Sequence, residues 1–326
     1  MPGKVPPDDL ITHVFGRTGA ADETVIQGPA DGEDAAAIGW PGDGDVLVVS
    51  SDPISLAASD VGTIGVHIAC NDVAASGADP HWLTTVILLP PGGGNDLESI
   101  TTDLDAAARD VGATIVGGHT EFVDALERPL LSLTAFGGTE RFVPTGGAEP
   151  GDRVLVTKGA GIEGTAILAA DFGDELEVGS DVRARAESFL EELSVVPESR
   201  VVREYATSMH DPTEGGVVAG LLEVARASNV GLEIERESIP VRAETWTFCD
   251  AAGVDPLRIF GSGALLAAVP EEVLEDAVAA LAAAGIDAAE IGAVTEGTGE
   301  LVLDGAPVRE PVEDELYPLW DARDNL

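Results

Sequence analysis

The chain has 326 residues, 44% of them hydrophobic, and its 59 acidic and 17 basic residues give a formal net charge of −42. The apolar content supports packed interiors and excludes a disordered chain, while the length favours about two domains. A charge of this sign repels nucleic acid and anionic membranes, so we expect neither as a partner.

Targeting signals and cysteine motifs are missing from the printed sequence. Its apolar runs are shorter than the roughly 20 residues that cross a bilayer, and its first ten residues lack the apolar core of a signal peptide. We therefore expect a cytoplasmic protein. Only Lys4 and Lys158 are lysines, a skew typical of a halophilic, acidic protein. Cys70 and Cys249 form no C-x-x-C pattern, which excludes a zinc ribbon and a disulfide framework.

The first half of the chain alternates between strand and helix patterns. These segments are a strand over 45–55, a helix over 60–78, a strand over 81–91, a helix followed by a strand over 96–118, and a strand over 128–140. A segment rich in glycine and proline, 143–152, then has no apolar period and predicts a boundary. We expect domains at 1–148 and 149–326.

The second half repeats the alternation, from a strand at 153–158 to a strand at 299–305. The order predicts two domains that mix helices and strands, an α/β (α+β) fold. Within this half, "GAGIEG" at 159–164 has the G-x-G-x-x-G spacing of a dinucleotide-binding turn. The region about 20 residues later is charged and helical, whereas an NAD site needs a strand ending in an acidic residue there. NAD binding therefore stays only a residual alternative, beside a tight turn that could face an anion.

Polar residues cluster where predicted strands end or glycine turns begin. Carboxylates in such places supply hard oxygen ligands for magnesium, and the glycines allow close backbone approach to phosphate. Each residue alone could instead be a helix cap, a turn former or a solvated side chain. The polar residues are Glu33, Asp34, Asp52, Asn71, Asp72, His119, Glu121, His210 and Asp211, and the glycines beside them include Gly117 and Gly118.

Seven motifs occur in the order "GEDAA", "SSDP", "NDVAASGADP", "GGHTE", "PGDRVLVTKGAGIEGTAI", "MHDPTEGG" and "DPLRIFGSGALLAAV". Over nearly the whole chain they resemble the aminoimidazole ribonucleotide (AIR) synthetase superfamily, which includes the hydrogenase-maturation protein HypE, selenophosphate synthetase and thiamine-phosphate kinase. The resemblance implies an N-terminal domain that dimerises through its sheet, a C-terminal domain, and ATP with Mg²⁺ between them. It implies transfer of the ATP γ-phosphoryl group to a substrate oxygen, commonly of an amide or carboxamide.

The resemblance also implies roles for individual residues. The metal–phosphate carboxylates would be Asp34, Asp52, Asp72 and Asp211, and Asn71 would help to orient the site. Gly117 and Gly118 would form the phosphate-facing turn. We place His119, Thr120, His210 and Thr213 with the cofactor-binding residues. The "GAGIEG" segment would belong to packing or turn chemistry in the second domain, which argues against NAD.

Three residues depart from the family pattern. Glu33 stands where an aspartate is usual, Glu214 stands where the hydrogenase-maturation branch often has a basic residue, and His119 replaces a carboxylate after the glycine pair. Glu121, two residues further on, could supply the missing oxygen to the metal. The sequence ends in "LWDARDNL" without the C-terminal cysteine on which HypE acts, and its first 30 residues lack the cysteine of selenophosphate synthetase.

We therefore expect an Mg-dependent, ATP-using enzyme, a phosphotransferase or an activating enzyme, acting on an unidentified small molecule. The alternative is a nucleotide-binding partner or scaffold that has lost turnover, which His119 and Glu214 would permit.

Overall fold

The structure is a computed structural model that describes residues 23–28, 30, 32–40, 46–54, 60–92, 94–308 and 312–324. Its first half forms a six-stranded sheet of order β1-β2-β3-β6-β4-β5, in which only β4 and β5 pair in parallel. The elements are β1 Val25–Gln27, β2 Ala36–Gly39, β3 Val46–Ile54, α2 Val61–Ala75, β4 Asp79–Leu89, α3 Gly94–Val111, β5 Thr114–Phe122 and β6 Leu130–Thr139.

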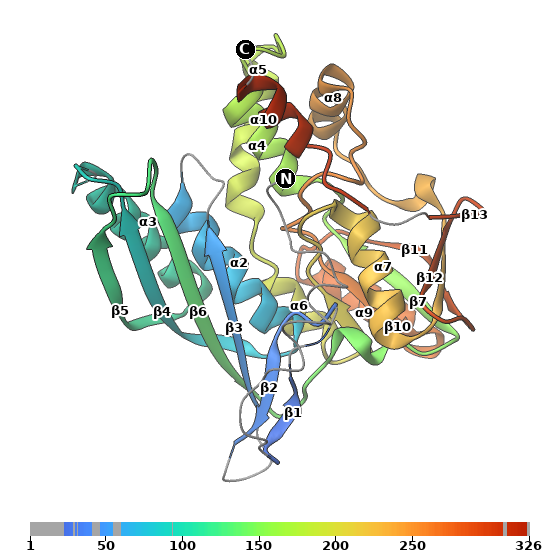
Figure 1. The fold of residues 1–326 in the computed structure, drawn as a ribbon. Helices are drawn as coiled ribbons and strands as arrows, with labels where there is room; N and C mark the ends of the chain where they lie inside the picture. The colour runs from blue at the N-terminus through green and yellow to red at the C-terminus, as the bar shows by residue number, and fades with distance from the viewer. Residues whose placement is uncertain are drawn as a thin grey trace.

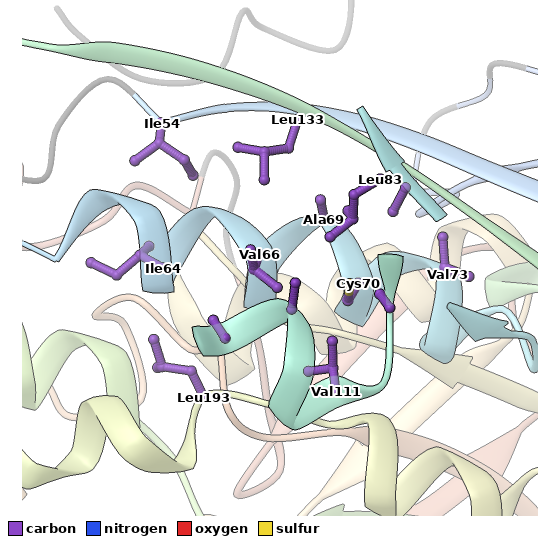
Figure 2. Close-up of a cluster of buried hydrophobic side chains, with 14 of the residues drawn as sticks. Ile54, Ile64, Val66, Ala69, Cys70, Val73, Leu83, Val111, Leu133 and Leu193 are labelled. Carbon is purple, nitrogen blue, oxygen red and sulfur yellow. The ribbon is translucent and has the colours of Figure 1, made fainter. Parts of the chain in front are cut away.

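Helix α2 packs on one face of this sheet, and α3 packs beside it (Figure 1). Strands β3, β4 and β6 alternate between buried and less buried residues, so one side chain in two faces α2. Figure 2 shows Ile54 and Leu133 facing α2 and Leu193 on its other side. A Cβ at Gly62 would lie 2.6 Å from the Ile100 carbonyl oxygen, so glycine allows α2 and α3 to approach closely.

The second half forms a seven-stranded sheet of order β13-β12-β9-β11-β7-β10-β8, antiparallel except for the β12–β9 pair. Its strands are β7 Asp152–Thr157, β8 Ser208–His210, β9 Gly231–Ile234, β10 Leu266–Pro270, β11 Ala288–Thr295, β12 Glu300–Leu303 and β13 Ala306–Pro307. The α-helices are α4 Ile162–Phe172, α5 Ser180–Glu187, α6 Val196–Val202, α7 Gly216–Ser228, α8 Ala243–Ala252, α9 Leu274–Ala283 and α10 Tyr317–Asp324. The 3-10 turns are η1 Thr145–Gly147, η2 Ser188–Glu192, η3 Arg236–Ser238 and η4 Glu271–Val273. The expected mixed α+β fold with two sheets is confirmed.

The two halves share a hydrophobic core. Ile162, Phe189, Leu193 and Val196 from the second half belong to the same buried cluster as the residues between α2 and the first sheet. Helix α2 therefore lies between the first sheet and the second half of the chain, which explains why it is buried on nearly all sides. Among the described residues, no helix is both long and apolar enough to span a membrane.

The opposite face of the first sheet carries exposed apolar side chains. Trp82 and Val86 of β4 are 47% and 37% exposed, and every residue of edge strand β5 is exposed. We call this surface, with Trp82 and Val86 at its centre, the open face. A sheet of this composition normally has both faces covered or one polar face, so the open face lacks a cover in the single chain.

Cys70 and Cys249 are both free and buried. Burial raises the pKa of the Cys70 and Cys249 thiols to about 12, so both stay protonated and unreactive at neutral pH.

Candidate active site

Two of the predicted carboxylates, Asp52 and Asp72, meet the hydroxyl of Ser50 at one side of α2, and Asp34 lies beside them. This hydroxyl donates to Asp72 Oδ2 at 2.6 Å and also lies 3.2 Å from Asp52 Oδ2. Ser50 and Asp52 come from β3 and Asp72 from α2, while the backbone carbonyl of Asp34 lies 3.4 Å from the same hydroxyl. The structure thus brings Asp34, Asp52 and Asp72 together from segments separated by up to 38 positions of sequence.

The gathered carboxylates carry excess negative charge. Asp72 is buried, and burial raises its pKa well above the ordinary value of 3.8, with the charges of Asp52 and Asp34 adding to the shift. The Ser50 hydrogen bond only partly offsets this. A group of this kind gains stability from a cation that pairs with several carboxylates at once.

His210 at the end of β8 holds Asp34 in position. Its Nδ1 lies 2.8 Å from Asp34 Oδ1, and its Nε2 lies 2.9 Å from Glu223 Oε2 on α7. Burial disfavours the imidazolium, but these two carboxylates outweigh burial and raise the pKa of His210 to about 10. With both ring nitrogens engaged by carboxylates, His210 positions Asp34 and has no nitrogen left for a nucleotide in this conformation.

Glu33, which departs from the family pattern, is turned away from the carboxylate group. Its two oxygens accept the backbone N–H groups of Thr145 and Gly146, at 3.2 and 3.1 Å. Burial raises the pKa of Glu33, and these backbone hydrogen bonds act in the opposite direction. The neighbouring Thr145 hydroxyl donates to Asp34 Oδ2 at 3.2 Å. Glu33 therefore anchors the connection between the two halves, and the adjacent Asp34 faces the site.

Asp211 follows His210 and is the most deeply buried of the predicted ligands, at 1% exposure. Neither of its carboxylate oxygens has a hydrogen-bond partner among the described residues within normal geometric limits. Burial and the charge of Asp34 raise the pKa of Asp211 well above 3.8. Buried polar atoms are normally satisfied, so these two oxygens are suited to a ligand or metal ion.

Asn71 is placed differently from the other polar residues of α2. Its amide donates to the Leu193 carbonyl at 2.8 Å and accepts from the Val195 N–H at 2.8 Å. It is fully buried and so fixes the backbone between η2 and α6 next to Asp72. Asn71 thus fixes a segment of backbone next to Asp72, and the Thr213 carbonyl accepts from the Gly216 and Gly261 N–H groups.

Gly118, the second glycine of the β5 pair, lies in the same row of the sheet as Asp52. Opposite residues in adjacent strands run from Asp52 through Leu133 and Thr85 to Gly118. Side chains in such a row share a face of the sheet, which is here the face covered by helices. A cavity of about 310 Å³ opens beside this end of the row. Its lining residues are Thr85, Ile87, Thr101, Leu104, Ile115, Gly117, Gly118, His119 and Thr120.

His119 and Glu121 lie one position out of phase with Gly118 and Thr120, so their side chains project from the open face. They share one side of the strand, as the sequence predicts, and His119 Nε2 lies 3.2 Å from Glu121 Oε2. Their side chains are 65% and 55% exposed. The structure does not bring Glu121 to Asp52 and Asp72 within one chain, because the sheet separates them.

The carboxylate oxygens of this group are of the type that binds Mg²⁺, although the side chains do not converge on a single point in this structure. Among the described residues, no three His, Cys, Asp or Glu side chains already form a metal-binding group. The unsatisfied oxygens of Asp211 and the raised pKa of Asp72 are the observations that favour a cation here. Hard carboxylate oxygens suit Mg²⁺, which is bound through one or two carboxylates together with phosphate oxygens.

The two sheets and the carboxylates around α2 are those of an AIR-synthetase-like protein. The chain belongs to the AIR synthase related protein family, whose N-terminal domain matches residues 32–139 and whose C-terminal domain matches residues 149–304. The resemblance that the motifs indicate is thereby confirmed.

Among its relatives, the chain is similar to the carbamoyl dehydratase HypE of Azotobacter vinelandii, with 35% identity over 253 residues that cover 74% of this chain and 72% of the relative. Two solved structures share its fold. HypE in a HypE–HypF complex has a TM-score of 0.75 and 26% identity, covering 93% of this chain and 99% of that one. A hydrogenase maturation protein HypE in complex with ATP has a TM-score of 0.67 and 25% identity, covering 95% and 96%.

Proposed function

We propose that this protein is an Mg-dependent, ATP-using enzyme that transfers the ATP γ-phosphoryl group to an amide-type oxygen of a small substrate, or activates that oxygen. The observation that carries the proposal is the group of Asp34, Asp52 and Asp72 around Ser50, with the unsatisfied Asp211 beside it. The similar HypE structure in complex with ATP supports a nucleotide as the ligand.

The roles of the residues follow from their positions. Asp34, Asp52, Asp72 and Asp211 would hold Mg²⁺, which when bound neutralises charge on the nucleotide phosphates. The His210 imidazolium keeps Asp34 turned toward the other carboxylates. Gly117, Gly118 and Thr120 line the cavity at the far end of the row that begins at Asp52, a place where backbone N–H groups can approach phosphate oxygens closely.

A homodimer forms part of the proposal, with the open face as its interface. Its exposed Trp82 and Val86 would be covered by a second copy of the same sheet. We also keep the division into domains at 1–148 and 149–326, which the separate matches at 32–139 and 149–304 support.

A nucleotide-binding protein partner without turnover is the second candidate. Two observations favour it: a similar HypE was solved in complex with HypF, and Glu121 lies across the sheet from the carboxylates that it was expected to assist. Product analysis separates the two candidates, because only the enzyme releases ADP in proportion to a modified substrate.

The test of nucleotide use is a thermal-shift titration with ATP and Mg²⁺, ATP alone, and NAD. At 100 times its dissociation constant, a ligand stabilises the folded protein by about 2.7 kcal/mol. We expect this effect with Mg–ATP and little with NAD. Asp72→Asn should weaken it, whereas Asp276→Asn on the exposed side of α9 is the matched control and should not. A larger effect with NAD than with Mg–ATP would overturn the proposal.

A further inference from the structure

Glu223 of helix α7 faces the carboxylate site through the ring of His210. Its Oε2 lies 2.9 Å from His210 Nε2, and His210 Nδ1 lies 2.8 Å from Asp34 Oδ1. The imidazole is 4% exposed and the Asp34 side chain 9%, so the contact between them is shielded from water. The three side chains form a continuous line from α7, in the second half of the chain, to a predicted metal ligand of the first half.

The same helix also restricts the plane of the imidazole ring. Gly220 lies three residues before Glu223 on α7, and the two residues share one side of the helix. A Cβ at Gly220 would lie 3.2 Å from His210 Cδ2 and 2.7 Å from Pro212 Cβ, so the glycine lets the helix backbone lie directly against the ring. A ring that is bonded at both nitrogens and packed against a helix backbone has little freedom to turn.

Helix α7 supports Asp34 from a second direction as well. The Ser228 hydroxyl at the end of α7 donates to the Thr145 carbonyl at 3.3 Å, and the Thr145 hydroxyl donates to Asp34 Oδ2 at 3.2 Å. Gly32, two residues before Asp34, packs directly on α7, since a Cβ there would lie 3.0 Å from the Glu223 carbonyl oxygen. The position of Asp34 is therefore set by contacts along most of the length of α7.

These hydrogen bonds leave the Asp34 carboxylate able to bind a cation. An ionised carboxylate has about four acceptor positions, so Asp34 can accept from His210 and Thr145 and still offer lone pairs to a metal ion. Groups that hold a metal-binding carboxylate in one direction typically change the metal affinity 10- to 100-fold when they are lost. The direction of this carboxylate depends on the His210 ring, and the direction of the ring depends on Glu223.

We propose that Glu223 is a positioning residue for Mg–ATP binding, which acts through the His210 ring to fix the direction of the Asp34 carboxylate. The inference rests on the proposed function, because it takes Asp34 as a ligand of the magnesium ion that is bound with ATP. Glu223 is not itself a metal ligand in this arrangement. The metal site of the first half is then complete only when α7 of the second half lies against it.

Calorimetric titration of Mg–ATP into the full chain tests this role with two variants of nearly the same shape. Glu223→Met removes the oxygen that faces His210 Nε2 and should weaken Mg–ATP binding about tenfold or more. Glu223→Gln keeps an acceptor oxygen there and should bind within about threefold of the wild type, because a neutral hydrogen bond keeps roughly half the strength of a charged one. The matched control, Glu233→Met, changes an exposed residue of β9 and should keep the wild-type affinity.

A double-mutant cycle shows whether Glu223 acts through the ring. His210→Asn keeps a donor near the position of Nδ1 but is too short to reach Glu223. Adding Glu223→Met to His210→Asn should therefore change the Mg–ATP affinity by less than about twofold. Urea unfolding checks that each variant folds, and Glu223→Ala replaces Glu223→Met if the longer side chain does not fit.

Two results would overturn the inference. One is a full second loss of affinity when Glu223→Met is added to His210→Asn, and the other is a loss in Glu223→Gln as large as the loss in Glu223→Met, which would point to the charge of Glu223 alone. If the wild type does not bind Mg–ATP, the proposed function fails and this inference fails with it. If the wild type binds Mg–ATP and Glu223→Met binds it equally well, only this inference fails.

Discussion

Replacing Glu163 by glutamine should stabilise the protein at alkaline pH. The folded chain keeps a proton on Glu163 up to a pKa of about 7, whereas the ordinary value is 4.5. Folding therefore binds a proton between these pH values, and wild-type stability falls as the pH rises through this window and levels off above 7. Glutamine has the same shape and no proton to lose, so the variant avoids this loss.

The size of the effect follows from the shift in pKa. Each pKa unit corresponds to about 1.4 kcal/mol, so the variant should gain roughly 3 kcal/mol over the wild type at pH 8. The gain should be about 2 kcal/mol smaller at pH 5.5, because this pH lies only about one unit above the ordinary pKa and most of the loss accumulates between pH 5.5 and 7. Asp314, whose pKa is also raised to about 7, remains in both proteins and cancels to first order.

Equilibrium urea unfolding at pH 5.5 and pH 8, at one fixed salt concentration, measures this difference in the free energy of unfolding. The exposed control Glu191→Gln should stay within about 0.5 kcal/mol of the wild type at both pH values. A Glu163→Gln variant that is less stable than the wild type at pH 8, or whose gain does not depend on pH, would show that Glu163 is ionised in the folded chain at little cost.

Three further predictions concern the interface, the core and the edge strand. Val86→Glu on the open face should convert a dimer of the 33.4 kDa chain to monomer, and light scattering that finds monomer for the wild type at all concentrations would refute the proposed interface. Asn71→Ala should destabilise the fold by about 2 kcal/mol or more, since it leaves two buried backbone groups unpaired, and urea unfolding measures this. His119 and Glu121 lie across the sheet from Asp52 and Asp72 within one chain, so His119→Asp and Glu121→Gln should both leave Mg–ATP binding unchanged, which calorimetry decides: a loss of affinity after Glu121→Gln would give that carboxylate a role in binding.

Much of the carboxylate site could be predicted from the sequence because its members follow strands or glycine turns. Asp34, Asp52 and Asp72 were expected together and lie together. Ser50 was not singled out, although it stands two residues before Asp52 and therefore on the same face of β3. The spacing of two residues, which places both side chains on one face of a strand, is the signal that could have identified Ser50.

Other features of the site depend on long-range packing that no local pattern encodes. Glu223 reaches His210 only because α7 folds back along β8, and the contact engages the second ring nitrogen of a histidine that was expected to bind the cofactor. The bulge where β5 pairs with β4 between Ile115 and Gly117 sets which face His119 and Glu121 occupy. The sequence assigned the segment around Glu163 to packing or turn chemistry. Its burial beside Asp314 joins residues 151 positions apart, so no local pattern could have revealed it.

The shared core has a consequence for how the protein is made. Phe189, Leu193 and Val196 complete the buried cluster around α2, yet they are synthesised after the whole first sheet. At ordinary translation speeds, residues 149–196 take roughly two to ten seconds to appear. During that interval the side of α2 that later contacts Leu193 has no cover, so the nascent chain presents an apolar helix face to whatever surrounds the ribosome. A fragment that ended at residue 148 would keep this face exposed permanently, and we expect it to aggregate where the full chain does not.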